Sequence, residues 1–328
     1  MHYRRLGKTG FDVSEISLGT WQVGGKWGTT FDHRLAERIL LAAIDRGVNF
    51  IDTADVYSNG ESERAVGKIL KQVDKRIYVA TKCGRQIAPH VNNGYTPAIL
   101  RSFVEESLRR LNVECLDLIQ LHCPPTEVYY RPEIFAEFDT LKREGKILNL
   151  GVSVEKVEEG VKALEFENVT SIQIIYNIFR QRPDERLFSQ AKAHDVGIIV
   201  RVPLASGLLT GKFTQATQFG KDDHRFFNRH GEMFDRGETF AGVPYDTGLE
   251  AVRRLSDSFP AQTNLAHVAL QWILMHDEVS CIIPGASSPE QVESNIQAAE
   301  FPRLDESELA AIQKIYTELV KPWVHHNW

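Results

Sequence analysis

The sequence alternates between two kinds of segment along almost its whole length, and this alternation restricts its fold more than any other feature. Stretches with apolar residues at three- and four-residue steps, typical of amphipathic helices, are separated by short β-branched runs, typical of buried strands. The first such helix is expected at residues 33–47, and a strand follows at 49–54. Further strands are expected at 77–82, 115–122, 147–153, 171–177, 197–203 and 280–285, with an opening strand at 16–20.

Eight strands with helices between them favour a closed parallel barrel, the (β/α)8 TIM barrel of the α/β class, over an open doubly wound sheet. An open sheet that binds a dinucleotide would carry Gly-x-Gly-x-x-Gly directly after its first strand. The glycines found there are Gly19, Gly24 and Gly25, which have the wrong spacing. We therefore predict a barrel, in which any bound dinucleotide occupies a different cradle.

Three segments lie outside the repeated strand–helix unit. Residues 1–15 contain two short strand-like runs joined by a turn at 8–10, which predicts an N-terminal β-hairpin that caps the bottom of the barrel. Residues 204–245, after the seventh strand, form a long aromatic loop that we expect to act as a lid or a ligand clamp. A helix-rich tail at 305–328 is expected to pack beside this loop. Because no linker interrupts the chain, we predict a single domain spanning 1–328.

Charge and composition narrow the class of partner. The chain has 38 Lys and Arg against 44 Asp and Glu, a net charge of −6, whereas nucleic acids and anionic membranes are bound through clustered basic residues. No stretch resembles a signal peptide or a membrane span, and the four cysteines include no Cys-x-x-Cys pair. We expect a cytoplasmic protein that acts on a small molecule, without nucleic acid, membrane or metal. The sequence leaves the oligomeric state open.

Ionisable residues stand at the ends of three consecutive predicted strands. These strands end on Asp52, Lys82 and His122, and Tyr57 follows in the loop after the first of them. Because the carboxyl ends of all the strands meet at one face of a barrel, we expect the four side chains to converge there. Taken singly, each has an ordinary interpretation: a structural ion pair, a wall histidine or a surface tyrosine. Their coincidence on neighbouring strands favours an active site.

This set of side chains suits the reduction of a carbonyl group. Hydride attack on an aldehyde or ketone places negative charge on the oxygen, which must be protonated as the charge develops. Tyr57 can donate that proton if a neighbouring cation, Lys82, eases its release, because a free phenol has a pKa of about 10. Asp52 would hold Lys82 through an ion pair, and His122 would orient the carbonyl oxygen. We therefore predict an oxidoreductase with Tyr57 as proton donor.

Six segments spread along nearly the whole chain resemble the aldo-keto reductase family. They are DRGVNFIDTADVYSNGESERAVGKIL, IYVATK, LDLIQLH, EGKILNLGVS, VPLASGLLTGK and IIPGASSPEQVESN. The resemblance implies a catalytic tetrad of Asp52, Tyr57, Lys82 and His122, and reversible reduction of an aldehyde, ketone or sugar carbonyl with a nicotinamide dinucleotide. The segments look closest to bacterial sugar and aldehyde reductases and to potassium-channel β subunits. The channel branch leaves an alternative open, a dinucleotide-binding redox sensor or regulatory subunit with little turnover.

The resemblance also implies how the nicotinamide end of the cofactor is held. The residues concerned are Gly19, Thr20, Trp21, Asp52, Ser153, Gln173 and Arg201. Ser153 and Gln173 match positions that bind the carboxamide, whose donors and acceptors a hydroxyl and an amide can satisfy. Two positions depart from the family pattern, because Val154 replaces an Asn and Arg201 replaces an aromatic ring that stacks on the nicotinamide. A guanidinium plane can also stack, although it adds positive charge beside a ring that becomes cationic on oxidation.

A second set of positions resembles those that bind the phosphates and the adenosine. After the seventh strand they are Pro203, Leu204, Ser206, Gly207, Leu208, Thr210 and Lys212, with Arg225 farther along the loop. After the eighth strand they are Gly285, Ala286, Ser287, Gln291, Ser294 and Asn295. This last group opens a helix, whose free N–H groups attract phosphate. Many relatives carry Lys or Arg where this chain has Ser287, yet Ser287 and Arg225 could both contact a 2′-phosphate. We expect NADP as cofactor, with NAD as the alternative.

The sequence does not define the substrate. We expect its pocket to be lined by Trp21, the segment after His122 and the lid around Phe226 and Phe227, which together give an apolar and aromatic wall. We assign no role to His325–Trp328, because terminal residues are usually frayed or simply packed.

Overall fold

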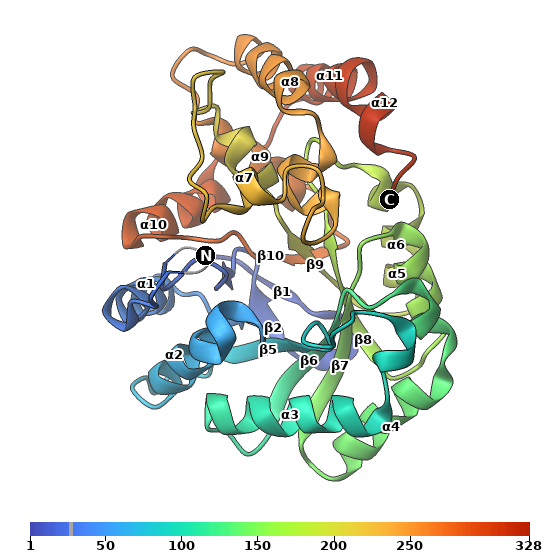
Figure 1. Ribbon diagram of the computed structural model, residues 1–328. Helices are drawn as coiled ribbons and strands as arrows, with labels where there is room; N and C mark the ends of the chain where they lie inside the picture. The colour runs from blue at the N-terminus through green and yellow to red at the C-terminus, as the bar shows by residue number, and fades with distance from the viewer. Residues whose placement is uncertain (26–28) are drawn as a thin grey trace.

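Eight parallel strands surround the barrel axis in the order in which they occur in the sequence (Figure 1). The computed structural model describes residues 1–25 and 29–328. The strands are β3 (Leu18–Gly19), β4 (Phe50–Asp52), β5 (Tyr78–Cys83), β6 (Leu116–His122), β7 (Ile147–Ser153), β8 (Val169–Ile175), β9 (Gly197–Arg201) and β10 (Val279–Ile282). The barrel closes beside β3 and β10, where the N–H of Ser17 donates to the carbonyl of Ile282 at 2.9 Å. The predicted (β/α)8 TIM barrel is therefore confirmed.

A helix follows each of these strands and covers the outside of the barrel (Figure 1). These helices are α1 (His33–Asp45), α2 (Glu61–Leu70), α3 (Pro97–Leu111), α4 (Pro132–Arg143), α5 (Val157–Ala163), α6 (Arg182–Ala193), α9 (Leu265–Leu274) and α10 (Pro289–Gln297). Capping side chains mark several starts: Asp32 accepts the N–H groups of Arg34 and Leu35 at 2.9 and 3.0 Å, and Ser288 caps α10. Each cap satisfies backbone donors that have no partner within the helix.

The N-terminal hairpin closes the bottom of the barrel, as predicted. Its strands β1 (Tyr3–Arg5) and β2 (Asp12–Ser14) pair antiparallel. Apolar side chains of the hairpin pack against those from the floor of the barrel in one buried cluster. The cluster comprises Leu6, Phe11, Val13, Phe50, Ala80, Leu118, Ile199, Cys281 and Ile283. The bottom is thereby filled with side chains, which leaves the opposite end for a ligand.

The insertion after β9 consists of short helical turns that lead into the longer helix α8, and the C-terminal helices pack beside it (Figure 1). Its elements are η5 (Ala205–Thr210), α7 (His224–Phe227), η6 (Arg236–Glu238), η7 (Phe240–Gly242) and α8 (Tyr245–Asp257). The tail contains α11 (Glu306–Ile315), the π-helical turn η9 (Tyr316–Val320) and α12 (Lys321–Val324). Other single turns are η1 (Gly7–Thr9), η2 (Tyr57–Gly60), η3 (Asn92–Gly94), η4 (Thr126–Tyr130) and η8 (Ala298–Glu300). The predicted packing of the tail against the insertion is confirmed.

Strand register brings the predicted polar residues to one end of the barrel. Lys82 pairs with Gln120 across β5 and β6, and Ser153 on β7 pairs with both His122 and Gln173. Neighbouring strands therefore place these side chains side by side at their carboxyl ends, where barrels carry their sites. Within residues 1–25 and 29–328, no helix combines the length and the apolar character that crossing a membrane requires.

Candidate active site

Asp52 is the centre of a buried charged cluster at the mouth of the barrel. The Nζ of Lys82 donates to Asp52 Oδ2 at 2.5 Å and to the carbonyl of Thr53 at 2.9 Å. The same Nζ donates to the hydroxyl of Tyr57 at 3.2 Å. The ring of His122 stands edge-on to Tyr57, with 6.1 Å between the centroids. The structure therefore brings together all four residues of the predicted tetrad.

The loop after β4 adopts a backbone conformation that presents Tyr57 to this cluster. Ser58, Asn59 and Gly60 all have positive φ angles, of 48°, 56° and 85°, so the chain turns sharply just after the tyrosine. Left-handed non-glycine residues are uncommon and concentrate at functional loops. The turn leads directly into α2, whose Glu63 is buried and accepts a hydrogen bond from Thr81 on β5 at 2.6 Å. Glu63 thus ties the loop to the barrel wall.

The electrostatics of the cluster keep a proton on the tyrosine and a charge on the lysine. Burial raises the pKa of Tyr57, and the nearby Lys82 opposes this shift. Burial alone would lower the pKa of Lys82, but Asp52 and Tyr57 outweigh it and raise that pKa. Burial and then the cations Arg85 and Lys82 hold the pKa of His122 well below its ordinary value. At neutral pH the cluster therefore contains a phenol, an ammonium and a neutral imidazole.

Two buried amides complete the environment of Asp52. Gln120 and Gln173 donate to its Oδ1 at 3.1 and 2.7 Å. Sequence reasoning missed Gln120, although it lies two residues before His122 and therefore on the same face of β6. Because the amide nitrogen of Gln173 is engaged with Asp52, its carbonyl oxygen is the atom best placed to accept a ligand's N–H.

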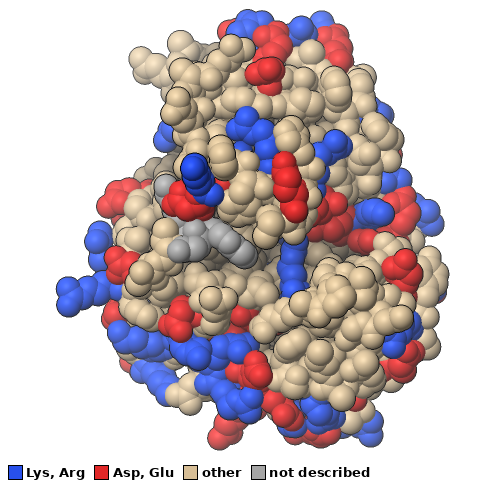
Figure 2. Space-filling model, viewed as in Figure 1, with Lys and Arg blue, Asp and Glu red and all other residues tan. Residues whose placement is uncertain are grey.

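A pocket of about 540 Å³ extends from this cluster to the N-terminal ends of α9 and α10. Figure 2 shows the hollow between the insertion and the barrel, with acidic and basic side chains at its margins. Most of the predicted cofactor residues line it: Gly19, Thr20, Trp21, Asp52, Gln173, Arg201, Pro203, Leu204, Ser206, Gly207, Thr210, Lys212, Arg225, Gly285, Ser287, Gln291, Ser294 and Asn295. Ser153, Leu208 and Ala286 are fully buried and lie outside the pocket wall. The pocket therefore joins most of the predicted cofactor positions to Asp52 and Tyr57, the two tetrad residues that line it.

At its far end the pocket offers polar groups that suit phosphates. Ser287 and Gln291 bond to each other at the start of α10, with the N–H of Ser287 donating to the Gln291 side chain at 2.8 Å. Lys212 supplies a cation from the insertion. Arg225 also lines the pocket, but its guanidinium pairs with Asp223 at 2.6 Å. That pairing reduces the charge that Arg225 can offer to an anion.

Comparison with known proteins identifies the family. A sequence model of the Aldo/keto reductase family matches residues 15–317. The chain belongs to this family. It is 30% identical to the NADH-specific methylglyoxal reductase of Escherichia coli, over 89% of this chain and 92% of the relative. It is 31% identical to a putative voltage-gated potassium channel subunit beta of Schizosaccharomyces pombe, over 91% and 88%.

A solved structure extends the likeness to three dimensions. The holo form of the aldo-keto reductase AKR11C1 from Bacillus halodurans shares 30% identity and covers 96% of each chain, with a TM-score of 0.76. As an aldo/keto reductase, this chain is an oxidoreductase of a family that uses nicotinamide cofactors and small carbonyl substrates. The resemblance found in the sequence, including its likeness to both bacterial reductases and a channel β subunit, is confirmed.

Arg201, the departure from the family pattern, belongs to an ion-pair network beside the tetrad. Its Nη2 donates to Glu155 at 2.9 Å and to the carbonyl of Val154 at 3.2 Å. Glu238, from the insertion, pairs with Arg85 at 2.9 Å and approaches Arg201 at 3.8 Å. Sequence reasoning missed Arg85, Glu155 and Glu238. Arg85 could have been suspected because it follows Lys82 by three residues.

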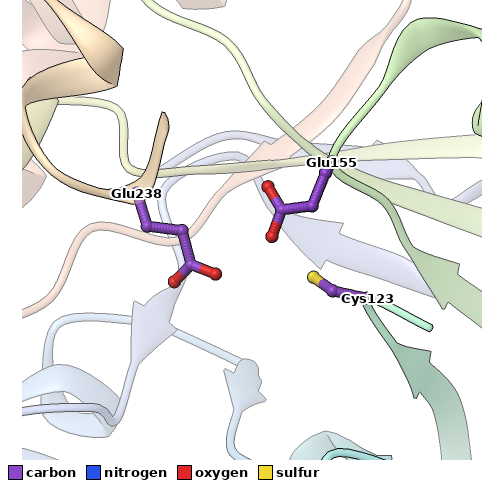
Figure 3. A group of neighbouring side chains, drawn as sticks. All are labelled: Cys123, Glu155 and Glu238. Atoms are coloured by element: carbon purple, nitrogen blue, oxygen red, sulfur yellow. The ribbon is translucent and has the colours of Figure 1, made fainter. Parts of the chain in front are cut away.

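Figure 3 shows that the side chains of Cys123, Glu155 and Glu238 point toward one another. Their ligand atoms lie within 4.8 Å of each other, close enough to surround a cation. Burial, however, raises the pKa of Cys123 and keeps its thiol protonated. Because the guanidinium groups of Arg85 and Arg201 already pair with the two carboxyl groups, we assign no metal to this group.

The aromatic wall of the pocket differs from the expectation. Trp21 lines it as predicted, edge-on to Tyr57 with 5.2 Å between the ring centroids. The lid helix α7 lines the pocket through His224 and Arg225, but Phe226 and Phe227 themselves do not, and Phe226 is 54% exposed. The expectation for the segment after His122 was wrong, because it lies outside the pocket wall. The aromatic side chains that take the place of Phe226 and Phe227 are Phe213, His224 and Phe234. The backbone of α7 determines which of its side chains face inward, and a sequence pattern cannot resolve this over a four-residue helix.

Proposed function

We propose that this aldo/keto reductase transfers a hydride between NAD(P)H and the carbonyl group of an aldehyde, ketone or sugar, with Tyr57 as the proton donor. The observation that carries this proposal is the chain of contacts from Asp52 through Lys82 Nζ, 2.5 Å away, to the Tyr57 hydroxyl at 3.2 Å. We also propose that residues 1–328 function as a single domain in the cytoplasm and that the reaction is reversible.

In this mechanism each side chain has a separate task. The reduced nicotinamide, when bound, supplies the hydride. Tyr57 releases its proton to the carbonyl oxygen, and the charge on Lys82 stabilises the phenolate that forms. Asp52 keeps Lys82 charged and in place, with its other oxygen held by Gln120 and Gln173. His122, a neutral imidazole, orients the carbonyl oxygen through a hydrogen bond.

We propose NADPH as the preferred electron donor. Lys212, Arg225 and Ser287 line the pocket at the end where a 2′-phosphate would lie, and two cations beside a hydroxyl group favour a phosphate dianion. Asp223 is the opposing feature, because it pairs with Arg225 and would accept a hydrogen bond from a ribose hydroxyl. One relative, from E. coli, is named for NADH specificity, so membership of the family does not by itself decide between NADPH and NADH. Parallel titration of the intrinsic fluorescence with NADPH and NADH measures the preference directly.

The test of function is steady-state reduction of methylglyoxal and 4-nitrobenzaldehyde with either cofactor, using Tyr57→Phe as the matched variant. We expect turnover by the wild type and a loss of about 100- to 10,000-fold in kcat for the variant, with cofactor affinity unchanged. Tight NADPH binding without turnover of any aldehyde or sugar by the wild type would contradict the reductase. That outcome would favour the redox-sensing or regulatory subunit suggested by the channel relative.

A further inference from the structure

Glu238 is a carboxylate that the insertion brings into the pocket beside the tetrad. It ends the short helix η6 and lines the same pocket as Tyr57, Trp21 and Phe234. The remaining wall at this end is largely aromatic, as the edge-on contact of Trp21 with Phe234 at 6.1 Å between centroids illustrates. A charged group in such a wall interacts with the polar atoms that a substrate places beside it, through hydrogen bonds or through charge.

Two arginines from the barrel hold the Glu238 side chain in its charged form. Arg85, which follows β5, donates to its Oε1 at 2.9 Å, and Arg201, at the end of β9, lies 3.8 Å from its Oε2. Burial acts to raise the pKa of Glu238, but Arg85 and Arg201 outweigh it and hold that pKa low, at about 2. Burial raises the pKa of the neighbouring Glu155, and a hydrogen bond with Glu155 contributes to the low pKa of Glu238. A carboxylate has about four acceptor positions, and Glu238 therefore retains acceptor capacity beyond its bond to Arg85.

The backbone that carries Glu238 is anchored separately, by Trp328. The indole Nε1 of Trp328 donates to Asp235 at 2.9 Å, and the guanidinium of Arg180 lies 4.1 Å over the ring. Gly237 and Gly242 pack so closely on the indole that a Cβ added at either position would press against it. The position of the backbone that carries Glu238 is thus set by contacts with Trp328, without any contribution from a substrate.

We propose that Glu238 determines substrate specificity, selecting uncharged carbonyl compounds that carry a hydroxyl group near the carbonyl over phosphorylated ones. This inference rests on the proposed function. A carboxylate accepts a hydrogen bond from a substrate hydroxyl, which an aromatic wall cannot do. It also repels a substrate phosphate, and it compensates the positive charges of Arg85 and Arg201, which would otherwise attract a phosphate. Removal of its charge should therefore change kcat/KM for the two substrate classes in opposite directions.

The experiment compares three substrates of similar size: propanal, glyceraldehyde and glyceraldehyde 3-phosphate. For Glu238→Gln we expect kcat/KM to fall about tenfold for glyceraldehyde relative to propanal, and to rise about tenfold for the phosphorylated aldehyde. Glu165→Gln, which removes an exposed carboxylate paired with Lys162, is the control and should leave all three values unchanged. NADPH binding, followed by fluorescence, reports whether each variant remains folded.

Two further variants keep the test decisive. Glu238→Asp retains the charge on a shorter side chain, so it should still exclude the phosphate while losing the preference for glyceraldehyde. Trp328→Ala should change kcat/KM for the three substrates in the same directions as Glu238→Gln, by a smaller factor. Trp328→Phe should restore part of the preference for glyceraldehyde. Equal changes for all three substrates would overturn the proposed role of Glu238. A wild type that reduces none of them with either cofactor would instead overturn the proposed function.

Discussion

The mouth of the barrel and the insertion contribute charges to one pocket, but they hold these charges in different ways. Asp52 and Lys82 lie on adjacent strands, are 2% and 1% exposed, and pair with each other. Glu238 and Arg85 form the corresponding pair of the insertion, which is 13% and 21% exposed and joins distant parts of the chain. The barrel pair depends on strand register, whereas the insertion pair depends on how a long loop packs. We therefore expect substitutions in the barrel to reduce stability and activity more than substitutions in the insertion.

The largest effect is expected from Lys82→Met. This change leaves Asp52 as a buried charge without its cation, which typically costs about 3–5 kcal/mol of the free energy of unfolding. In the proposed mechanism it also removes the group that stabilises the Tyr57 phenolate. Urea denaturation measures the first effect and steady-state aldehyde reduction the second. The double variant Asp52→Asn, Lys82→Met should regain stability without regaining activity, and a double variant no more stable than the single one would contradict this account.

The next effect concerns Asp55, which is buried in the loop between Asp52 and Tyr57. Burial and then Glu63 raise its pKa from 3.8 to about 7. As the pH rises from 4 to 7, the unfolded chain loses this proton while the folded chain keeps it, so the free energy of unfolding falls until the pH passes the folded pKa. Asp55→Asn cannot ionise. Its stability gain should therefore grow from about pH 4 to about pH 7, to at most about 4 kcal/mol, and then level off.

Thermal and urea denaturation of Asp55→Asn across this pH range check the prediction. The matched control is Asp74→Asn, which changes an exposed aspartate and should give no such pH-dependent gain. A gain for Asp55→Asn that stays constant across the range would show that the buried carboxyl is not the cause.

A smaller effect is expected in the insertion, from Lys212→Ala. Lys212 is exposed but lines the pocket, so its removal should weaken NADPH binding about tenfold at low salt and reduce the salt dependence of that binding. Fluorescence titration at two ionic strengths gives both quantities. Lys221→Ala, in the same loop but outside the pocket wall, is the control. Equal losses in the two variants would mean that only the net charge of the loop matters.

The smallest effect is expected where the two regions meet, at Arg201. If its guanidinium lies beside the nicotinamide, as proposed, it should disfavour the oxidised, cationic ring, but the hydrogen-bonded pair of Glu155 and Glu238, at 2.9 and 3.8 Å, compensates part of its charge. Arg201→Gln should therefore increase the affinity for NADP⁺ relative to NADPH by only about threefold. Separate titrations with the two forms measure this ratio. An unchanged ratio would place the guanidinium too far from the ring to affect its charge.

The sequence was a better guide to the barrel than to the insertion. Periodicity located the strands, and Asp52, Lys82 and His122 could be placed together because parallel strands share one end. Gln120 was missed although the two-residue period of a strand aligns it with His122. In the insertion the lining aromatics were misassigned to the α7 phenylalanines, since short turns have no repeating pattern from which an inward face could be read.

The sequence by itself determined the barrel, the tetrad and the family, because each follows from local periodicity or from motifs that keep their order along the chain. Only the tertiary structure decided that Glu238 meets Arg85 and Arg201, and that Trp328 is buried at 5% exposure against the insertion. These contacts join segments that are far apart in the sequence. They depend on the balance of buried charges and on the packing of the Trp328 ring, and neither can be read from the spacing of residues in the sequence.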